Sequence, residues 1–129
     1  MNGKHMQIGE VATRTELSLR TIRHYEETGL VVPSARSRGG FRLYTESDVS
    51  RLMVIRRMKP LGFTLDEMRE LLAATDRLDA GDAPAAEREE LLRRVRRFEE
   101  AVRQRVADLR TKLARAEEFA ATLKERLET

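Results

Sequence analysis

The chain has 129 residues, of which 36% are charged and 5% aromatic, a composition that favours one small domain with exposed helices over a large core. The absence of cysteine excludes disulfides, thiolate metal sites and thiol redox chemistry. Residues 1–62 carry 11 Lys and Arg against 6 Asp and Glu, whereas residues 63–129 carry 14 against 16, so the positive charge lies in the first half. This basic excess indicates an anionic partner there.

The opening residues, MNGKHM, differ in character from the rest of the chain, and a His-Met pair at this position is typical of a cloning junction. We therefore expect residues 1–5 to be a cloning remnant, with Met6 as the natural start and residues 6–74 as the first domain. The sequence contains no secretory segment and no apolar run long enough to cross a bilayer, so we expect a cytoplasmic protein without a membrane partner.

Two short helices joined by a turn are predicted near the start, over about residues 7–14 and 18–28. Ser18 is placed to cap the second helix, because its hydroxyl can accept a bond from a free backbone N–H of the first turn. Leu19 and Ile22 mark the expected inner side of this helix. Together these signals predict a helix-turn-helix.

Residues 35–44, ARSRGGFRLY, alternate in type on both sides of a Gly-Gly pair, which predicts a small β-hairpin that we call the wing. Thr45 is placed to cap a third helix over about 46–60. The run TLDE that begins at Thr64 is a capping box and starts a fourth helix over about 65–74. The fold class is therefore mainly α with a small β-hairpin.

Residues 75–84, TDRLDAGDAP, are expected to be a loop, after which no Gly or Pro interrupts residues 85–129. With Leu92 at a and Val95 at d, ten of eleven a and d positions are apolar, and Glu99 is the exception. Such a stripe needs a partner helix, for which a second copy of the chain is the natural choice. The expected dimer contacts are Leu92, Val95, Val102, Val106, Leu109, Leu113, Ala116, Ala120, Leu123 and Leu127. The alternative is that the seam folds back on the chain's own N-terminal domain.

Five arginines lie among aromatic residues in the helix-turn-helix and the wing. On a helical wheel, the outer face of the second helix carries Arg20, Arg23, His24 and Glu27. In a helix-turn-helix this face enters the DNA major groove. The planar fork of arginine can bond guanine O6 and N7 together, or grip a phosphate. We therefore expect this helix to contact double-stranded DNA, with His24 either a contact or merely an exposed histidine.

The wing adds a second expected contact, because its small glycines let the backbone approach a phosphate chain closely. The polar side chains around its tip are Arg36, Ser37, Arg38 and Arg42. Tyr25 and Tyr44 are expected to offer hydroxyls to phosphates and ring faces to sugars. The alternative for all these arginines is a solvated charged surface, in which Glu26 and Glu27 partner Arg23. His5 and His24 cannot make a metal site alone, so we expect no metal and no cofactor.

A resemblance to the MerR family of bacterial transcription regulators covers about residues 7–74, in the segments IGEVA, LRTIRHYEETGLVVPSARSRGGFRLYTESDV and RRMKPLGFTLDEMRELL. It implies a winged helix-turn-helix domain and an antiparallel coiled-coil homodimer formed by the long helix. It also implies binding to a palindromic promoter operator between the −35 and −10 elements. There the family bends and untwists an over-long spacer, so that RNA polymerase can engage both elements.

The resemblance also assigns residues to the DNA contact. The matching positions are Arg20, Thr21, Arg23, His24 and Tyr25 on the recognition helix, Arg36, Arg38, Phe41, Arg42 and Tyr44 on the wing, and Lys59 beside Pro60 at a backbone-contacting position. The capping residue Ser18 is also expected among the DNA contacts. The family's metal and redox sensors use cysteines near the start of the long helix. This chain has none, so a thiol-based sensor is not expected.

The leading hypothesis is a dimeric, sequence-specific DNA-binding regulator. The alternatives are an architectural or recombination accessory protein that bends DNA without regulating a promoter, and a simple steric repressor. An enzyme is not expected, because the sequence has no cysteine, no paired-carboxylate cleft and no phosphate-cradling glycine loop. A plain coiled-coil interaction protein would leave the wing and its arginines unexplained.

Overall fold

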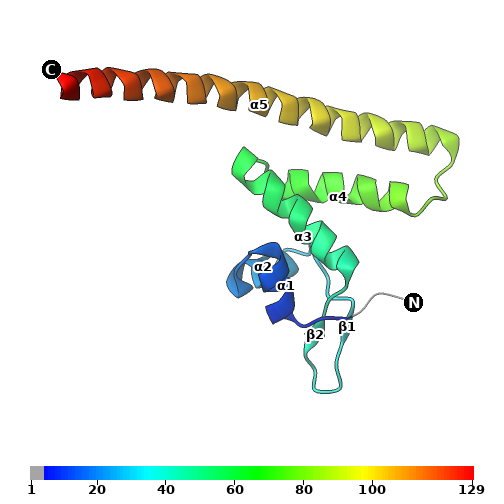
Figure 1. Ribbon diagram of the computed structural model, residues 1–129. Helices are drawn as coiled ribbons and strands as arrows, with labels where there is room; N and C mark the ends of the chain where they lie inside the picture. Colours follow the sequence, from blue (N-terminus) through cyan, green and yellow to red (C-terminus); the bar gives the residue numbers. More distant parts are fainter. Residues whose placement is uncertain (1–4) are drawn as a thin grey trace.

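The computed structural model describes residues 5–129, a helical chain with one small hairpin (Figure 1). The expected cloning remnant lies outside the described residues, except for His5. Among the described residues, no helix is both long and apolar enough to span a membrane. In chain order the elements are α1 (Ile8–Thr15), α2 (Leu19–Glu27), β1 (Ala35–Arg36), β2 (Arg42–Leu43), α3 (Glu46–Met58), the 3-10 turn η1 (Lys59–Leu61), α4 (Leu65–Asp79) and α5 (Ala85–Glu128).

The predicted helix-turn-helix is confirmed by α1 and α2. Ser18 caps α2 by accepting a hydrogen bond of 3.1 Å from the Thr21 N–H, and Gly29 closes the helix at a φ of 81°. The prediction that Leu19 and Ile22 both face inward was wrong for one residue, because Ile22 is buried but Leu19 is 40% exposed. The buried side of α2 runs through Ile22 and Tyr25. Since three residues fall short of a full turn by about 60°, Leu19 stands about 120° away from Tyr25.

The predicted wing is a two-stranded antiparallel hairpin in which Ala35 pairs with Leu43 and Arg36 with Arg42. Its turn contains Gly40 at a φ of 84°, a conformation that only glycine adopts without strain. At the base of the hairpin, the backbone N–H and C=O of Met6 each bond to Tyr44 at 2.8 Å. This isolated antiparallel bridge attaches the start of the described chain to the edge of the wing.

The third helix is shorter than predicted, because α3 ends at Met58 and continues as η1. Pro60 has no N–H to donate to the carbonyl four residues earlier, which ends the α-helical bonding. At the other end, Thr45 caps α3 as predicted, but within a capping box that was not foreseen. The partner is Asp48, whose buried carboxylate accepts from the Thr45 N–H at 2.9 Å and from the Ser34 hydroxyl at 2.7 Å.

The fourth helix begins at the predicted capping box, in which Thr64 and Glu67 exchange bonds of 2.8 and 3.1 Å. Its predicted end was wrong, because α4 continues to Asp79 and only the residues from 80 to 84 connect it to α5. Residues 75–79 contain no helix breaker, and the first residue at positive φ is Gly81. Ion pairs from Arg51 to Asp76 and from Arg77 to Glu87 stabilise this last turn.

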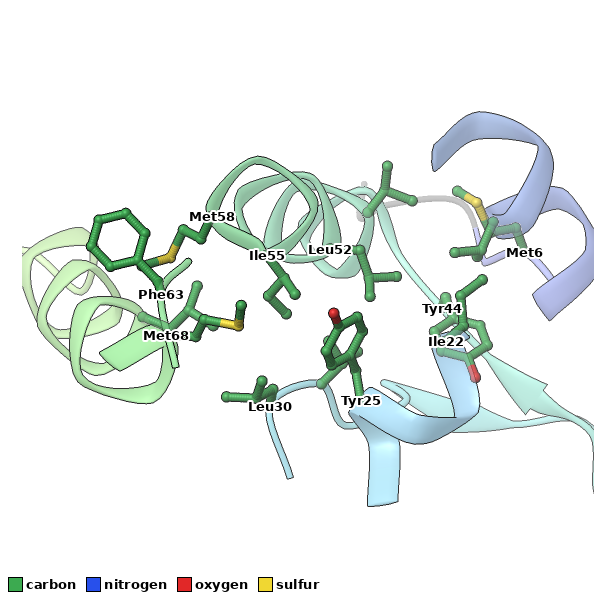
Figure 2. Packing of buried hydrophobic residues seen from close by; sticks show 14 residues of the cluster. Met6, Ile22, Tyr25, Leu30, Tyr44, Leu52, Ile55, Met58, Phe63 and Met68 are labelled. Carbon is green, nitrogen blue, oxygen red and sulfur yellow. The ribbon is translucent and has the colours of Figure 1, made fainter. Parts of the chain in front are cut away.

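The core lies where α3 crosses the helix-turn-helix, the wing and α4 (Figure 2). Leu52 and Ile55 of α3 are fully buried, as are Ile22 of α2, Tyr44 of the wing and Met68 of α4. Each element therefore contributes its apolar side to one cluster. Burying such a side chain fully contributes about 1.5–3 kcal/mol, which fixes α2 and the wing on one framework.

The long helix α5 has two different halves (Figure 1). Its first half runs antiparallel to α4 and buries Leu91, while Phe98 packs with its ring centroid 6.0 Å from that of Phe63. Arg105 lies with its guanidinium carbon 3.9 Å from the Phe63 ring centroid, and its Nε donates a 2.7 Å bond to the Leu61 carbonyl. The fold-back alternative is therefore correct for this half.

The second half of α5 extends away from the domain, and every side chain from Val106 onward is exposed in the single chain. Of the expected dimer contacts, those in the first half are half-buried, namely Leu92, Val95 and Val102. Those in the second half are exposed: Val106, Leu109, Leu113, Ala116, Ala120, Leu123 and Leu127. The large apolar side chain of Phe119 is also exposed there, although the heptad pattern did not include it.

Candidate nucleic-acid interface

Besides its buried residues, helix α2 is held by hydrogen bonds near its C-terminal end. The Nε of Arg51 on α3 donates a 2.9 Å bond to the Leu30 carbonyl, and Nη2 of Arg69 on α4 donates a 2.6 Å bond to the Thr28 carbonyl. Cationic donors are favourable at this end, where helix carbonyls lack intrahelical partners. The N-terminal turn of α2 is closed by the Ser18 and Thr21 hydroxyls, which bond each other at 2.9 Å. The outer face is thereby left free.

The outer face of α2 carries Arg20, Arg23 and His24, all exposed to solvent. The alternative in which Glu26 or Glu27 neutralises Arg23 is wrong, since Glu26 pairs with Arg42 instead. None of the ion pairs between described residues includes Arg20 or Arg23. Two arginine forks thus remain available to an anion on this face.

A groove of about 580 Å³ runs between α2 and η1. Arg20, Thr21 and His24 line it from one side, and Lys59 lines it from the other. The structure therefore brings the predicted backbone contact Lys59 next to the predicted recognition helix. Sequence reasoning missed Arg56, which lines the same groove near the end of α3. It lies three residues before Lys59, the first residue of η1, and this spacing was the available signal.

The wing borders the opposite side of α2. A hollow of about 250 Å³ lies between them, and Arg23, Arg36 and Arg42 all line it. Within the wing, Arg36 Nη1 donates a 3.1 Å bond to the Gly40 carbonyl, and the Ser37 hydroxyl accepts a 3.1 Å bond from the Phe41 N–H. Arg38 and Phe41 are exposed near the tip. Arginines from both elements thus line one hollow, together with Glu26 and Glu27 of α2.

The two tyrosines occupy different places from those predicted. Tyr25 is only 5% exposed and Tyr44 is fully buried, so neither offers a ring face to a sugar. The Tyr44 hydroxyl donates a hydrogen bond to Glu26 Oε2. Burial, and then this bond, raise the pKa of Tyr44 well above its usual range, and burial raises the pKa of Tyr25. Both tyrosine rings pack in the core, so Phe41 is the exposed aromatic residue among the predicted DNA contacts.

The described residues contain no group of three or more His, Asp or Glu placed to hold a metal ion. The surface around α2, between η1 and the wing, combines two hollows that are each lined by three cationic side chains. Such a surface can bind phosphate groups through its lysine and arginine side chains, and the exposed α2 face can reach base edges.

Comparison with known proteins gives two family matches. The family described as MerR HTH family regulatory protein matches residues 6–75, and the family described as MerR, DNA binding matches residues 49–126. The HTH-type transcriptional regulator ZntR of Escherichia coli K12 is 49% identical over 67 residues, 52% of this chain and 48% of its own. The mercuric resistance operon regulatory protein of Bacillus cereus is 43% identical over 74 residues, 57% of this chain and 56% of its own. The chain spans about half the length of the curated relatives it matches.

Two solved structures share the fold. The transcription regulator PbrR691 from Ralstonia metallidurans CH34, in complex with lead(II), is 38% identical, with 82% of this chain and 78% of that chain covered and a TM-score of 0.55. HiNmlR, a regulator lacking the sensor domain and bound to promoter DNA, is 21% identical, with 95% and 92% covered and a TM-score of 0.73. These proteins are transcription regulators, not enzymes. Because the first family match alone covers more than half of the residues, the chain belongs to the MerR family of helix-turn-helix regulatory proteins.

Proposed function

We propose that the chain is a sequence-specific transcription regulator that binds a palindromic promoter operator as a homodimer and distorts the DNA. The position of α2 supports this proposal, because its exposed face lies between the groove at Lys59 and the hollow at Arg36 and Arg42. In this reading Arg20 and Arg23 contact base edges, while the flanking cations hold phosphates and set the register.

The exposed half of α5 supports the homodimer. Its seam presents Leu109, Leu113 and Leu123 at exposed fractions of 50%, 58% and 48%, and such a stripe is stable in water when a second helix covers it. An antiparallel pairing of two copies, as the family resemblance implies, sets two recognition faces apart on one side of the dimer. The DNA-binding part then comprises residues 6–74 and the dimerisation helix residues 85–129, joined by the end of α4 and the loop after it.

DNA distortion results if the two faces are held at a spacing that straight B-DNA does not match. Bending or untwisting the duplex then costs about 1–6 kcal/mol, which the additional phosphate contacts offset. At a promoter the consequence is a realigned spacer that RNA polymerase can engage. Promoter DNA and RNA polymerase share the bacterial cytoplasm, so the proposal implies that location.

The experiment has three steps. The wild-type chain first selects its site from a random duplex library, and circular-permutation gel shifts then measure the bend in that site. Transcription is then measured in vitro on promoters with a series of spacer lengths. We expect a bent complex and activation that depends on spacer length. Undistorted DNA with repression at every length would indicate a steric repressor, and a bend without effect on transcription would indicate an architectural protein.

A further inference from the structure

Glu26 lies at the junction between α2 and the wing, and its side chain is only 9% exposed. Its Oε1 is 2.9 Å from Nε of Arg42, and its Oε2 accepts the hydrogen bond from the Tyr44 hydroxyl. Arg42 lies in β2 and Tyr44 follows that strand directly, whereas Glu26 lies in α2, the proposed recognition helix. One carboxylate therefore connects the two elements that border the hollow of about 250 Å³.

The base of the wing is anchored in the core by the buried ring of Tyr44, but the strands beyond it have few other contacts that hold their direction. Its ladder consists of the two pairs Ala35 with Leu43 and Arg36 with Arg42, extended by the bridge from Met6 to Tyr44. A two-stranded hairpin of this size is marginal in water unless it packs against something else. The bond and the ion pair to Glu26 add a polar contact with α2 to the packing of the Tyr44 ring, and the ladder provides neither.

Arg42 keeps most of its donors despite this tie. The Arg42 side chain is 44% exposed, and the pair with Glu26 engages Nε, which leaves the two terminal nitrogens for another acceptor. A carboxylate beside a surface that binds DNA lowers the raw attraction for phosphates, because like charges repel. Its presence here is accounted for by orientation, since a fixed guanidinium loses less freedom on meeting a phosphate than a mobile one.

We propose that Glu26 is a positioning residue for DNA recognition, which holds the wing at a fixed angle to α2 and presents the terminal nitrogens of Arg42 to one backbone phosphate. The proposal rests on the DNA-binding function above and adds a residue that neither helical-wheel position nor positive charge would select. It separates two quantities: Glu26 weakens binding to any DNA slightly, and it improves the preference for the operator.

The test compares Glu26→Gln with Glu27→Gln. Both variants remove one negative charge from the same helix, but Glu27 is exposed, whereas Glu26 is tied to the wing. Binding is measured on the duplex selected by the wild-type chain and on a scrambled duplex, and circular dichroism checks that both variants are folded. Glu27→Gln should tighten both complexes alike. Glu26→Gln should tighten the scrambled complex yet lower the ratio of operator to scrambled affinity about tenfold, the size of one lost charge-assisted contact.

A second pair of variants tests the route through Arg42. In an Arg42→Ala background, Glu26→Gln should leave the operator preference unchanged, because the group that it positions is gone. Tyr44→Phe keeps the buried ring, removes the hydroxyl donor and should lower the preference less than Glu26→Gln does.

Three results would overturn the assignment: an unchanged preference in Glu26→Gln, an equal loss on both duplexes, or a full additive loss in the Arg42→Ala background. If the wild-type chain itself selected no duplex, the DNA-binding function would fail, a result distinguishable from failure of Glu26 alone.

Discussion

Replacing Leu109 and Leu113 with aspartate should convert the proposed homodimer to monomers without unfolding the domain. Both side chains are about half exposed in the single chain, at 50% and 58%, so the change costs the monomer little. Covering the remaining half of a leucine contributes about 1 kcal/mol, and the two positions occur in both chains, so about 4 kcal/mol of association free energy is lost. That amount raises the dissociation constant about a thousandfold, before the cost of burying carboxylates.

The matched control is Ala107→Asp with Ala114→Asp, which adds the same charge to the same helix two residues before Leu109 and one residue after Leu113, off the seam. Sedimentation velocity measures the oligomeric state, and circular dichroism measures the helix content. We expect monomers from the leucine variant and dimers from the alanine variant, with operator binding lost only in the former. A leucine variant that still sediments as a dimer would refute α5 as the main interface.

Three further predictions concern single side chains. Arg20→Ala should cost about 1–3 kcal/mol at one base position of each half-site, whereas Arg38→Ala should weaken all duplexes alike and reduce the salt slope by about 0.9; equal losses on operator and scrambled DNA for Arg20→Ala would contradict the base contact. Because the pKa of Tyr44 is raised in the folded chain, the native state keeps a proton that the unfolded state releases, so the contribution of Tyr44 to the free energy of unfolding should be constant below about pH 10 and fall above it. Urea titrations at a series of alkaline pH values should show a smaller fall for Tyr44→Phe, and identical profiles would exclude this residue as the source. Arg105→Met should lower the free energy of unfolding by about 2 kcal/mol, through the lost bond to Leu61 and the lost contact with Phe63, and an unchanged urea midpoint would argue against that contribution.

Local signals predicted the elements of the fold well, because they act within a few residues. Ser18, Thr45 and Thr64 each cap the helix that they were expected to cap. The end of α4 was less predictable. By themselves, residues 75–79 favour neither helix nor loop. Ion pairs with Arg51 and Glu87, elsewhere in the chain, stabilise them as helix.

In the candidate site, the sequence could predict only the features that depend on residues within one element. The exposed positions of Arg20 and Arg23 agree with helical spacing within α2. The roles of Tyr44 and Glu26 could not be predicted in this way, because a tyrosine next to arginines is equally compatible with a surface contact and with a buried ring. The choice depends on packing between the wing and α2, which are separated in sequence by 18 residues at the bond from Tyr44 to Glu26.

Arg105 contacts Phe63 and Leu61 at the point where α5 leaves the domain. The exposed second half of α5 therefore acts as a lever that pivots at this contact. From Arg105 to Glu128 the helix extends about 35 Å, so a tilt of about 5° at the pivot moves the far end by about 3 Å. That displacement is close to the rise of one base pair, about 3.4 Å. In the proposed dimer, small changes in the packing around Phe63 would therefore change the preferred distance between half-sites by about one base pair. Operator spacing can then evolve through this pivot while every DNA-facing side chain stays the same.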